Sequence, residues 1–220
     1  MKIGIMQPYF FPYLGYFQLI HSVDKYVNLD HVSFMKRSYM TRNTIKDDIL
    51  NVNVYGGSQN KKCNEIFVNF ENNYNKKLFS KLHHLYSKSK YYEQTISFIK
   101  PFFEEREITI SEFNINIIKS ICYLLEIKTE IINTSSGYTT LKKGEGLKEI
   151  TKILGGDEYV NAIGGQSLYN KEDFKNSNID LYFIQMCEIS IDNRYSSIMD
   201  ILFNYPVEHI KEQITKYKLI

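Results

Sequence analysis

The chain has 220 residues, of which 43% are hydrophobic and 24% charged, and its formal net charge is +2. Such a chain is long enough to bury a core, its charge is too small for a nucleic-acid-binding face, and no apolar run approaches the roughly twenty residues that span a bilayer. The three cysteines are widely separated, which predicts neither a disulfide framework nor a metal site. Free thiols, and an N-terminus that makes a poor signal peptide, predict a cytoplasmic protein.

The first twenty residues predict a strand, a turn and a helix in close succession. A short apolar run over residues 3–6 is typical of a buried strand. Pro8 and Pro12 then exclude both a helix and strand pairing, so the chain turns there. Apolar positions from Leu14 onward favour a helix that ends near Asp24.

This turn carries three side chains that can form hydrogen bonds: Gln7, Tyr9 and Tyr13. The turn follows the carboxyl end of the first strand, where ligands of α/β proteins bind, and it leads into a helix N-terminus, which favours anions. We therefore predict the active site around it. The alternative is structural, because aromatic residues beside prolines often cover a sheet edge and Gln7 can satisfy backbone groups of the turn.

Residues 25–70 are predicted to be mainly extended. Alternating polarity predicts strands at 25–29, 51–55 and 64–70, the last two antiparallel to each other. Between them, residues 34–43 are polar and cationic without a clear period. Residues 73–126 predict three successive amphipathic helices, which we expect to form a lobe or cover on the α/β core.

Strands and helices alternate in the remainder of the chain. Strands are predicted at 129–133, 159–163 and 180–187, and helices at 146–154, from Ser196 or Ser197 to Pro206, and from there to the C-terminus. Such alternation requires crossover connections and hence a largely parallel sheet. The expected fold is α/β, with a mostly parallel Rossmann-like sheet and an inserted helical lobe at about 73–126, in a single domain over 1–220.

Several groups capable of chemistry follow predicted strands or lie on the last core helix, and we expect them to gather at one rim of the sheet. Besides the residues of the turn, they are Asp30, His31, Lys36, Arg42, Asn43, Ser135, Ser136, Gly164, Gly165, Asp200 and Asn204.

One pair of these residues is suited to accept a proton, and another is suited to bind an anion. Asp30 and His31 can orient an imidazole as a general base, although neighbouring side chains on a strand diverge and need not act together. Lys36 and Arg42 suit a phosphate group, with Arg42 able to bind it through two hydrogen bonds. The alternative interpretations are structural: Asp30 is then a turn residue and His31 a surface histidine. Lys36 and Arg42 then belong to a solvated charged loop.

Two further groups have equally open interpretations. Ser135 and Ser136, followed by a glycine, can hold a phosphate or an oxyanion, yet this is also common turn chemistry. Asp200 and Asn204 are four residues apart and share one helical face beside an apolar stripe. They are either a structural hydrogen-bonding pair or site residues.

Together these motifs resemble the WbqC-like protein family from residue 3 to about 205. The matching segments are 5–17, Asp24, Asp30–His31, 36–43, Ser135–Ser136, 155–159, Gly164–Gly165 with Tyr169, and 196–204. Two positions depart from the family pattern. Tyr39 replaces a tryptophan, and Tyr205 with Pro206 replaces a glycine-containing end.

The resemblance implies a cytoplasmic transferase of bacterial surface-polysaccharide biosynthesis, which makes lipopolysaccharide O-antigen or capsule. Members resemble proteins proposed to attach an acyl or aminoacyl group, such as glycine, to the amine of a nucleotide-linked amino sugar. The opening segment is also similar to that of HUP-type nucleotidylyltransferases, but their His-x-Gly-His residues are absent. An ATP-dependent nucleotidyl-transfer or ligase-type enzyme is therefore one alternative, and a non-catalytic sugar-nucleotide binding protein is another.

Under the acyltransferase hypothesis, His31 or Asp30 removes a proton from the sugar ammonium, and Gln7 or Asn43 donates to the developing oxyanion. The remaining candidates bind substrate: Tyr9, Tyr13, Lys36, Arg42, Ser135, Ser136, Gly164, Gly165, Asp200 and Asn204. No tightly bound cofactor or metal is expected. The partners expected are the nucleotide-linked amino sugar and an activated acyl or aminoacyl donor of unknown type, such as an acyl carrier or a charged tRNA, with neither DNA nor membrane. A homodimer is left open.

Overall fold

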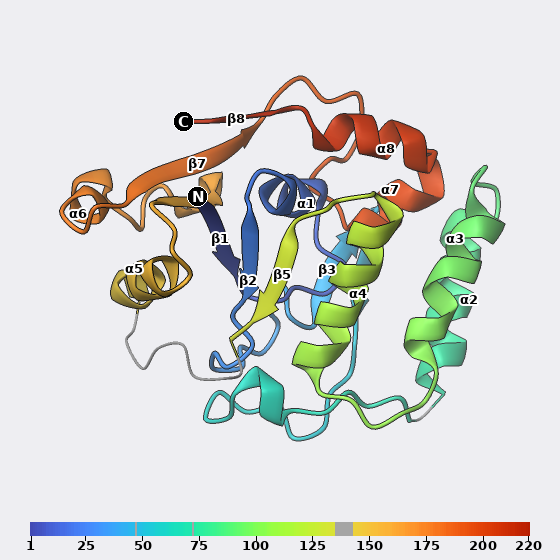
Figure 1. Cartoon of the computed structure of the whole chain (residues 1–220). Helices are drawn as coiled ribbons and strands as arrows, with labels where there is room; N and C mark the ends of the chain where they lie inside the picture. Colours follow the sequence, from blue (N-terminus) through green and yellow to red (C-terminus); the bar gives the residue numbers. More distant parts are fainter. Residues whose placement is uncertain (47, 72, 135–142) are drawn as a thin grey trace.

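Six strands form the central sheet of the computed structural model, in the order β5-β2-β1-β6-β7-β8 (Figure 1). The strands are β1 (Lys2–Met6), β2 (Lys25–Asn28), β5 (Glu130–Asn133), β6 (Glu158–Ala162), β7 (Asp180–Met186) and β8 (Tyr217–Leu219). The first five are parallel, and β8 is antiparallel to β7. The chain runs outward from β1 through β2 to β5 and then returns to β6 on the other side of β1. This α/β architecture with a mostly parallel, Rossmann-like sheet confirms the predicted fold class.

The structure describes residues 1–46, 48–71, 73–134 and 143–220. In these ranges, helices cover both faces of the sheet (Figure 1). One face packs against α1 (Leu14–His21), α4 (Ile110–Leu124), α7 (Ile198–Asn204) and α8 (Val207–Ile214). On the same side, α2 (Tyr74–Tyr86) and α3 (Tyr92–Ile99) lie further from the sheet. The other face packs against α5 (Lys143–Ile153) and α6 (Lys171–Lys175). No helix in these ranges combines the length and the apolar character that crossing a membrane requires.

Alternation along the strands produces these two cores. Tyr26 and Val160 face the larger helical layer, whereas their neighbours Val27 and Tyr159 face α5 and α6. All four side chains are almost fully buried. Burial on both faces explains why each of these strands has two consecutive apolar residues at its centre.

The three helices predicted within 73–126 are present, and α4 and α7 each begin with a side-chain cap. Thr109 caps α4 by accepting a hydrogen bond from the Glu112 amide, and the Glu112 carboxylate accepts from Thr109 in return. Ser197 caps α7 by accepting from the Met199 amide.

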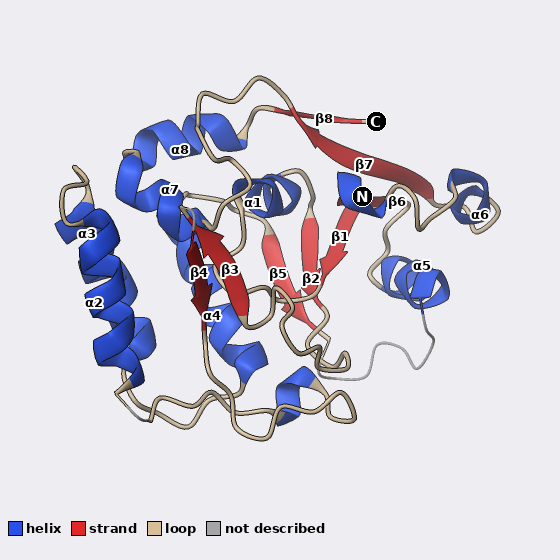
Figure 2. Cartoon of the chain, turned by 180° about the vertical axis from the view of Figure 1, so that it is seen from behind, coloured by secondary structure: helices blue, strands red, loops and turns tan. Residues whose placement is uncertain are grey.

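Two predictions of secondary structure were wrong. In place of extended strands at 51–55 and 64–70, the structure has a hairpin of β3 (Arg42–Ile45) and β4 (Asp48–Asn51) (Figure 2). The two predicted segments do meet antiparallel, as expected, but through the isolated bridge between Val54 and Val68 rather than as strands. The last helix ends at Ile214, and the chain continues into β8. Strands of three or four residues are too short to show a period, and their pairing partners decide them: β3 and β4 pair with each other, and β8 pairs with β7.

The turn between β1 and α1, residues 7–13, is fixed by side chains from three other elements and from α1. We call it the proline turn. Its carbonyl oxygens accept hydrogen bonds from Tyr16 of α1, Asn43 of β3, Asn114 of α4 and Ser197 before α7. Asn43 Nδ2 donates to Phe10 O at 3.1 Å and to Phe11 O at 2.8 Å. Because all four donor side chains are buried, these carbonyls have no access to water as a substitute.

Phe11 shows how strongly the proline turn is constrained. Its φ is 41°, in the left-handed region that non-glycine residues rarely occupy. Its carbonyl accepts from both Asn43 and Ser197, the latter at 2.8 Å. Such strain persists only where surrounding contacts over-determine the backbone, and it is concentrated at functional sites.

We predict that Asn43→Ala lowers the free energy of unfolding by about 2–3 kcal/mol, because it removes two donors from buried carbonyls. Asn51→Ala is the matched control on the same hairpin: its exposed amide contacts only Asn53, and we expect a change within about 0.5 kcal/mol. Urea unfolding followed by circular dichroism measures both. Equal stabilities for the two variants would contradict the role assigned to Asn43.

Candidate functional site

A cavity of about 590 Å³ lies at the carboxyl ends of β1 and β6. This is the point at which the strand order reverses, since β1 continues to β2 on one side and β6 lies on the other. Open α/β sheets bind their ligands at such a crevice. The proline turn, the end of β6, the first part of α5 and the loop before α7 all contribute lining residues.

Unpartnered polar groups surround this cavity. They are the side-chain amide of Gln7 and the hydroxyls of Tyr9, Tyr13, Tyr39, Tyr169 and Tyr195. None of these groups has a hydrogen-bond partner within the described ranges. Water can reach these groups, and a ligand with several hydroxyl or amide groups could replace it as their hydrogen-bond partner.

Two pairs of tyrosine rings frame the cavity. The ring centroids of Tyr9 and Tyr39 are 5.4 Å apart, and those of Tyr13 and Tyr195 are 6.2 Å apart. Tyr39 is 59% exposed and Tyr195 70% exposed, which is unusual for large aromatic residues. Exposed rings beside a cavity provide flat surfaces on which a nucleobase or the apolar face of a sugar can stack.

The wall of the cavity is electrically neutral in the part of the chain that the structure describes. Burial, followed by the neighbouring phenols of Tyr9, Tyr195 and Tyr39, raises the pKa of Tyr13 to about 12, and burial also raises the pKa of Tyr9. Both hydroxyls therefore keep their protons near neutral pH and can donate as well as accept. The lining residues in the described part of the chain include no Asp, Glu, Lys, Arg or His.

The glycine pair after β6 shapes one wall. A Cβ at Gly165 would lie 2.6 Å from Nδ2 of Asn161, whereas a Cβ at Gly164 would meet nothing within 4 Å. Asn161 lines the cavity and its Oδ1 accepts from the Ala162 amide at 2.8 Å. Gly165 is thus the residue that permits Asn161 to approach the backbone, and Gly164 leaves the space beside the cavity open.

Six residues predicted from the sequence line this one cavity: Gln7, Tyr9, Tyr13, Asn43, Gly164 and Gly165. Among them, Asn43 has its two amide hydrogens on carbonyls of the proline turn, and its Oδ1 accepts from the Thr44 amide. Its side chain holds the turn in place, so the amides of Gln7 and Asn161 are the ones on this wall whose nitrogens donate to no described residue.

Asp30 and His31 lie at the same rim of the sheet, and neither is among the residues that line this cavity. Both follow β2, and Asp30 lines a hollow of about 550 Å³ together with Asn133 and the first turns of α4. Both side chains are within hydrogen-bond distance of the Thr134 hydroxyl. The two residues therefore do not line the cavity of Gln7.

The remaining candidates are separate from the cavity. Lys36 and Arg42 are exposed and make no ion pair with any described residue, although they flank Tyr39 and Asn43 in sequence. Asp200 is 3% exposed and accepts a hydrogen bond from Tyr86 of α2. Asn204 donates to the Asp200 carbonyl. This pair joins α7 to α2, in keeping with the structural interpretation.

Ser135 and Ser136 lie outside the described residues. Sequence reasoning missed Tyr39, Asn161, Tyr169 and Tyr195 as lining residues. Asn161 stands one residue before the end of β6 and three before the predicted Gly164, which is the signal that could have found it. Tyr39 and Tyr195 lie on loops with no period, so the sequence contains no comparable signal for them.

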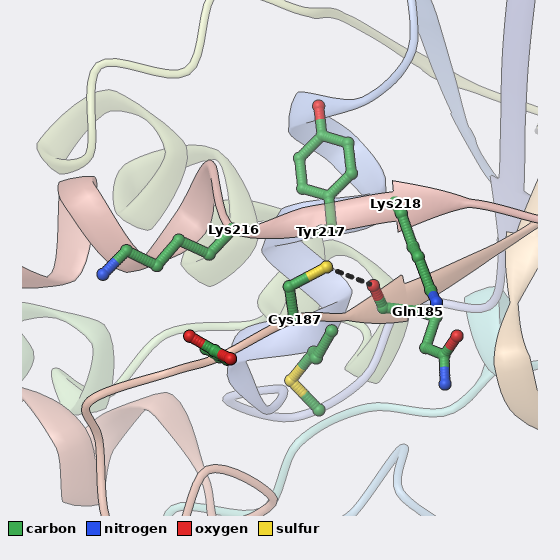
Figure 3. Close-up of a pocket in the computed structure, with 7 residues that line it drawn as sticks. Gln185, Cys187, Lys216, Tyr217 and Lys218 are labelled. Atoms are coloured by element: carbon green, nitrogen blue, oxygen red, sulfur yellow. Dashed lines mark hydrogen bonds between the residues drawn. The ribbon is translucent and has the colours of Figure 1, made fainter.

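A third hollow lies along the β7–β8 edge (Figure 3). Cys187 Sγ lies 4.0 Å from the Gln185 carbonyl, and the side chains of Lys216 and Tyr217 point in different directions. Because its polar groups do not converge, we assign the candidate site to the tyrosine-lined cavity. Within the described ranges, no three His, Cys, Asp or Glu side chains are grouped to hold a metal ion.

Comparison with known proteins adds a family to this geometry. Uncharacterized protein Rv1507c of Mycobacterium tuberculosis (strain ATCC 25618 / H37Rv) is 26% identical over 180 residues, which cover 79% of this chain and 77% of the relative. No solved structure matches the chain significantly. The family model of the WbqC-like proteins matches residues 7–212, from the first residue of the proline turn into α8. The chain therefore belongs to the WbqC-like protein family.

Proposed function

We propose that this protein is an N-acyl or aminoacyl transferase, for example a glycyl transferase, that acts on the amine of a nucleotide-linked amino sugar in O-antigen or capsule biosynthesis. The observation that carries this proposal is a set of tyrosine hydroxyls and the Gln7 amide, none bonded to another described residue, around one cavity at the β1–β6 switch point. Sugars offer both polar hydroxyls and apolar ring faces, and a wall of neutral tyrosines complements both.

The proposed reaction joins the sugar amine to the carbonyl carbon of an activated donor. The ammonium first loses a proton, because only the neutral amine has an electron pair for attack. The new C–N bond places negative charge on the carbonyl oxygen, where Gln7 can donate. Collapse of this intermediate breaks the bond to the leaving group of the donor. Tyr9 and Tyr13 bind the sugar, and the exposed Lys36 and Arg42 suit its diphosphate.

A second candidate function is non-catalytic binding of a sugar nucleotide. The neutral cavity wall favours it, since the described lining residues include no acid or base other than phenols. The two candidates differ in one measurable respect. A transferase changes the mass of the amino sugar when an acyl donor is present, whereas a binding protein leaves it unchanged.

We predict that Gln7→Ala lowers kcat for acyl transfer about 100-fold, the typical cost of losing one oxyanion donor. Tyr13→Phe should lower kcat/KM about 2- to 13-fold, the range for one neutral hydrogen bond of about 0.5–1.5 kcal/mol. Tyr123→Phe is the control, because Tyr123 is 87% exposed on α4. Mass spectrometry of the amino sugar nucleotide, incubated with acyl and glycyl thioesters, measures turnover. If the protein binds the sugar nucleotide but forms no product from any donor, non-catalytic binding is favoured. An unchanged rate in Gln7→Ala would show that Gln7 is not the oxyanion donor.

We also predict that the two glycines respond differently to a single methyl group. Gly165→Ala displaces the Asn161 amide, so it should weaken nucleotide-sugar binding at least about 10-fold, as expected for a misplaced polar group in a shaped site. Gly164→Ala meets no neighbouring atom and should stay within about threefold of the unmodified protein. Isothermal titration calorimetry compares them. The reverse order of the two affinities would show that this wall does not contact the ligand.

A further inference from the structure

The hydroxyl of Thr134 links Asp30 to His31. Thr134 follows β5 and is fully buried. Its Oγ1 lies 2.9 Å from Asp30 Oδ1 and 2.8 Å from His31 Nδ1. The direct distance from His31 Nδ1 to Asp30 Oδ1 is 3.9 Å, too long for a hydrogen bond. Although the two neighbouring side chains diverge, one hydroxyl from a strand about a hundred residues away therefore connects them.

The single hydroxyl hydrogen determines which ring nitrogen of His31 carries a proton. Thr134 can donate either to the Asp30 carboxylate or to His31 Nδ1, but not to both. The carboxylate is the stronger acceptor, and Asp30 is only 4% exposed. The other nearby acceptor, the Asn28 carbonyl at 3.0 Å, already receives the Thr134 amide. When Thr134 donates to Asp30, its oxygen must accept from His31, so the proton of neutral His31 resides on Nδ1.

We propose that Thr134 is a positioning residue that fixes His31 as the Nδ1–H tautomer and thereby presents Nε2 as a proton acceptor. Its use in catalysis rests on the proposed function. The side chain of His31 is 27% exposed, so it can be reached from solvent. His31 also follows β2, which pairs in parallel with β1 through Met6 and Asn28. It therefore lies at the same rim of the sheet as Gln7.

The proposed proton transfer runs from the sugar ammonium to His31. An N–H bond of the sugar ammonium breaks and leaves its electron pair on nitrogen, while a new N–H bond forms at His31 Nε2. The resulting imidazolium donates through Nδ1 to Thr134, whose hydroxyl donates to the Asp30 carboxylate. The negative charge of Asp30 thus stabilises the imidazolium through one intervening hydroxyl. The imidazolium gives this proton to the leaving group of the acyl donor, and neutral His31 then accepts the second proton, which the nitrogen carries after attack and which passes on to solvent.

Long-range ¹H–¹⁵N NMR of the full chain labelled with ¹⁵N-histidine tests this assignment, because the two ring nitrogens of a neutral imidazole have distinct shifts. The His31 signal is identified by its loss in His31→Gln. We expect the Nδ1–H tautomer in the unmodified protein and in Thr134→Ser, and a shift to the Nε2–H tautomer in the isosteric Thr134→Val. An Nε2–H signal in the unmodified protein would overturn the proposal even if Thr134→Val fails to fold.

Kinetics test the consequence for acyl transfer. We expect Thr134→Val to lower kcat at least about 10-fold with KM unchanged, because it presents the wrong tautomer, and Thr134→Ser to restore the rate. An unchanged kcat in Thr134→Val would overturn the positioning role while leaving the transferase proposal intact. The NMR measurement needs no substrate, so a failure of the proposed function would not alter its outcome.

Discussion

The backbone of the proline turn is held by buried side chains from β3, α4, α7 and α1, and the candidate site depends on this constraint. Asn43, Asn114 and Ser197 each donate a buried hydrogen bond to a carbonyl oxygen of this turn. Prolines alone limit φ but do not choose one conformation for the segment between them. The amide and hydroxyl donors make that choice, including the left-handed backbone at Phe11. Once the turn is fixed, Gln7, Tyr9 and Tyr13 are presented together beside the carboxyl end of β1.

Two kinds of environment meet at this rim of the sheet. The cavity between β1 and β6 is neutral and aromatic, with hydroxyls that keep their protons because burial raises the pKa of Tyr9 and Tyr13. The carboxyl end of β2 instead carries a linked carboxylate, hydroxyl and imidazole. Separating a neutral binding surface from a proton-accepting pair suits a reaction in which an ammonium must be deprotonated beside a polyhydroxylated substrate. Under the proposed function, binding and proton transfer are divided between neighbouring strands.

Much of this arrangement could be predicted from local patterns, and the rest depends on distant contacts. The strand ends, the proline turn and the glycine pair are visible in the sequence because prolines, glycines and apolar periods are local signals. The bridge from Thr134 to Asp30 joins residues 104 apart, and the Tyr86–Asp200 contact joins residues 114 apart. No local pattern encodes either. For the same reason the sequence leaves two interpretations of Asp200 open, and the hydrogen bond from Tyr86 supports the structural one.

The most direct test of the account is ring-selective ¹³C NMR of the tyrosines during titration with a nucleotide-linked amino sugar, with signals assigned by Tyr→Phe variants. The account predicts that shifts are confined to the tyrosines that line the cavity, above all Tyr9, Tyr13 and Tyr195, and that Tyr123 on α4 and Tyr217 on β8 do not respond. Saturable shifts at Tyr217 or Tyr123, with the cavity tyrosines unchanged, would contradict it.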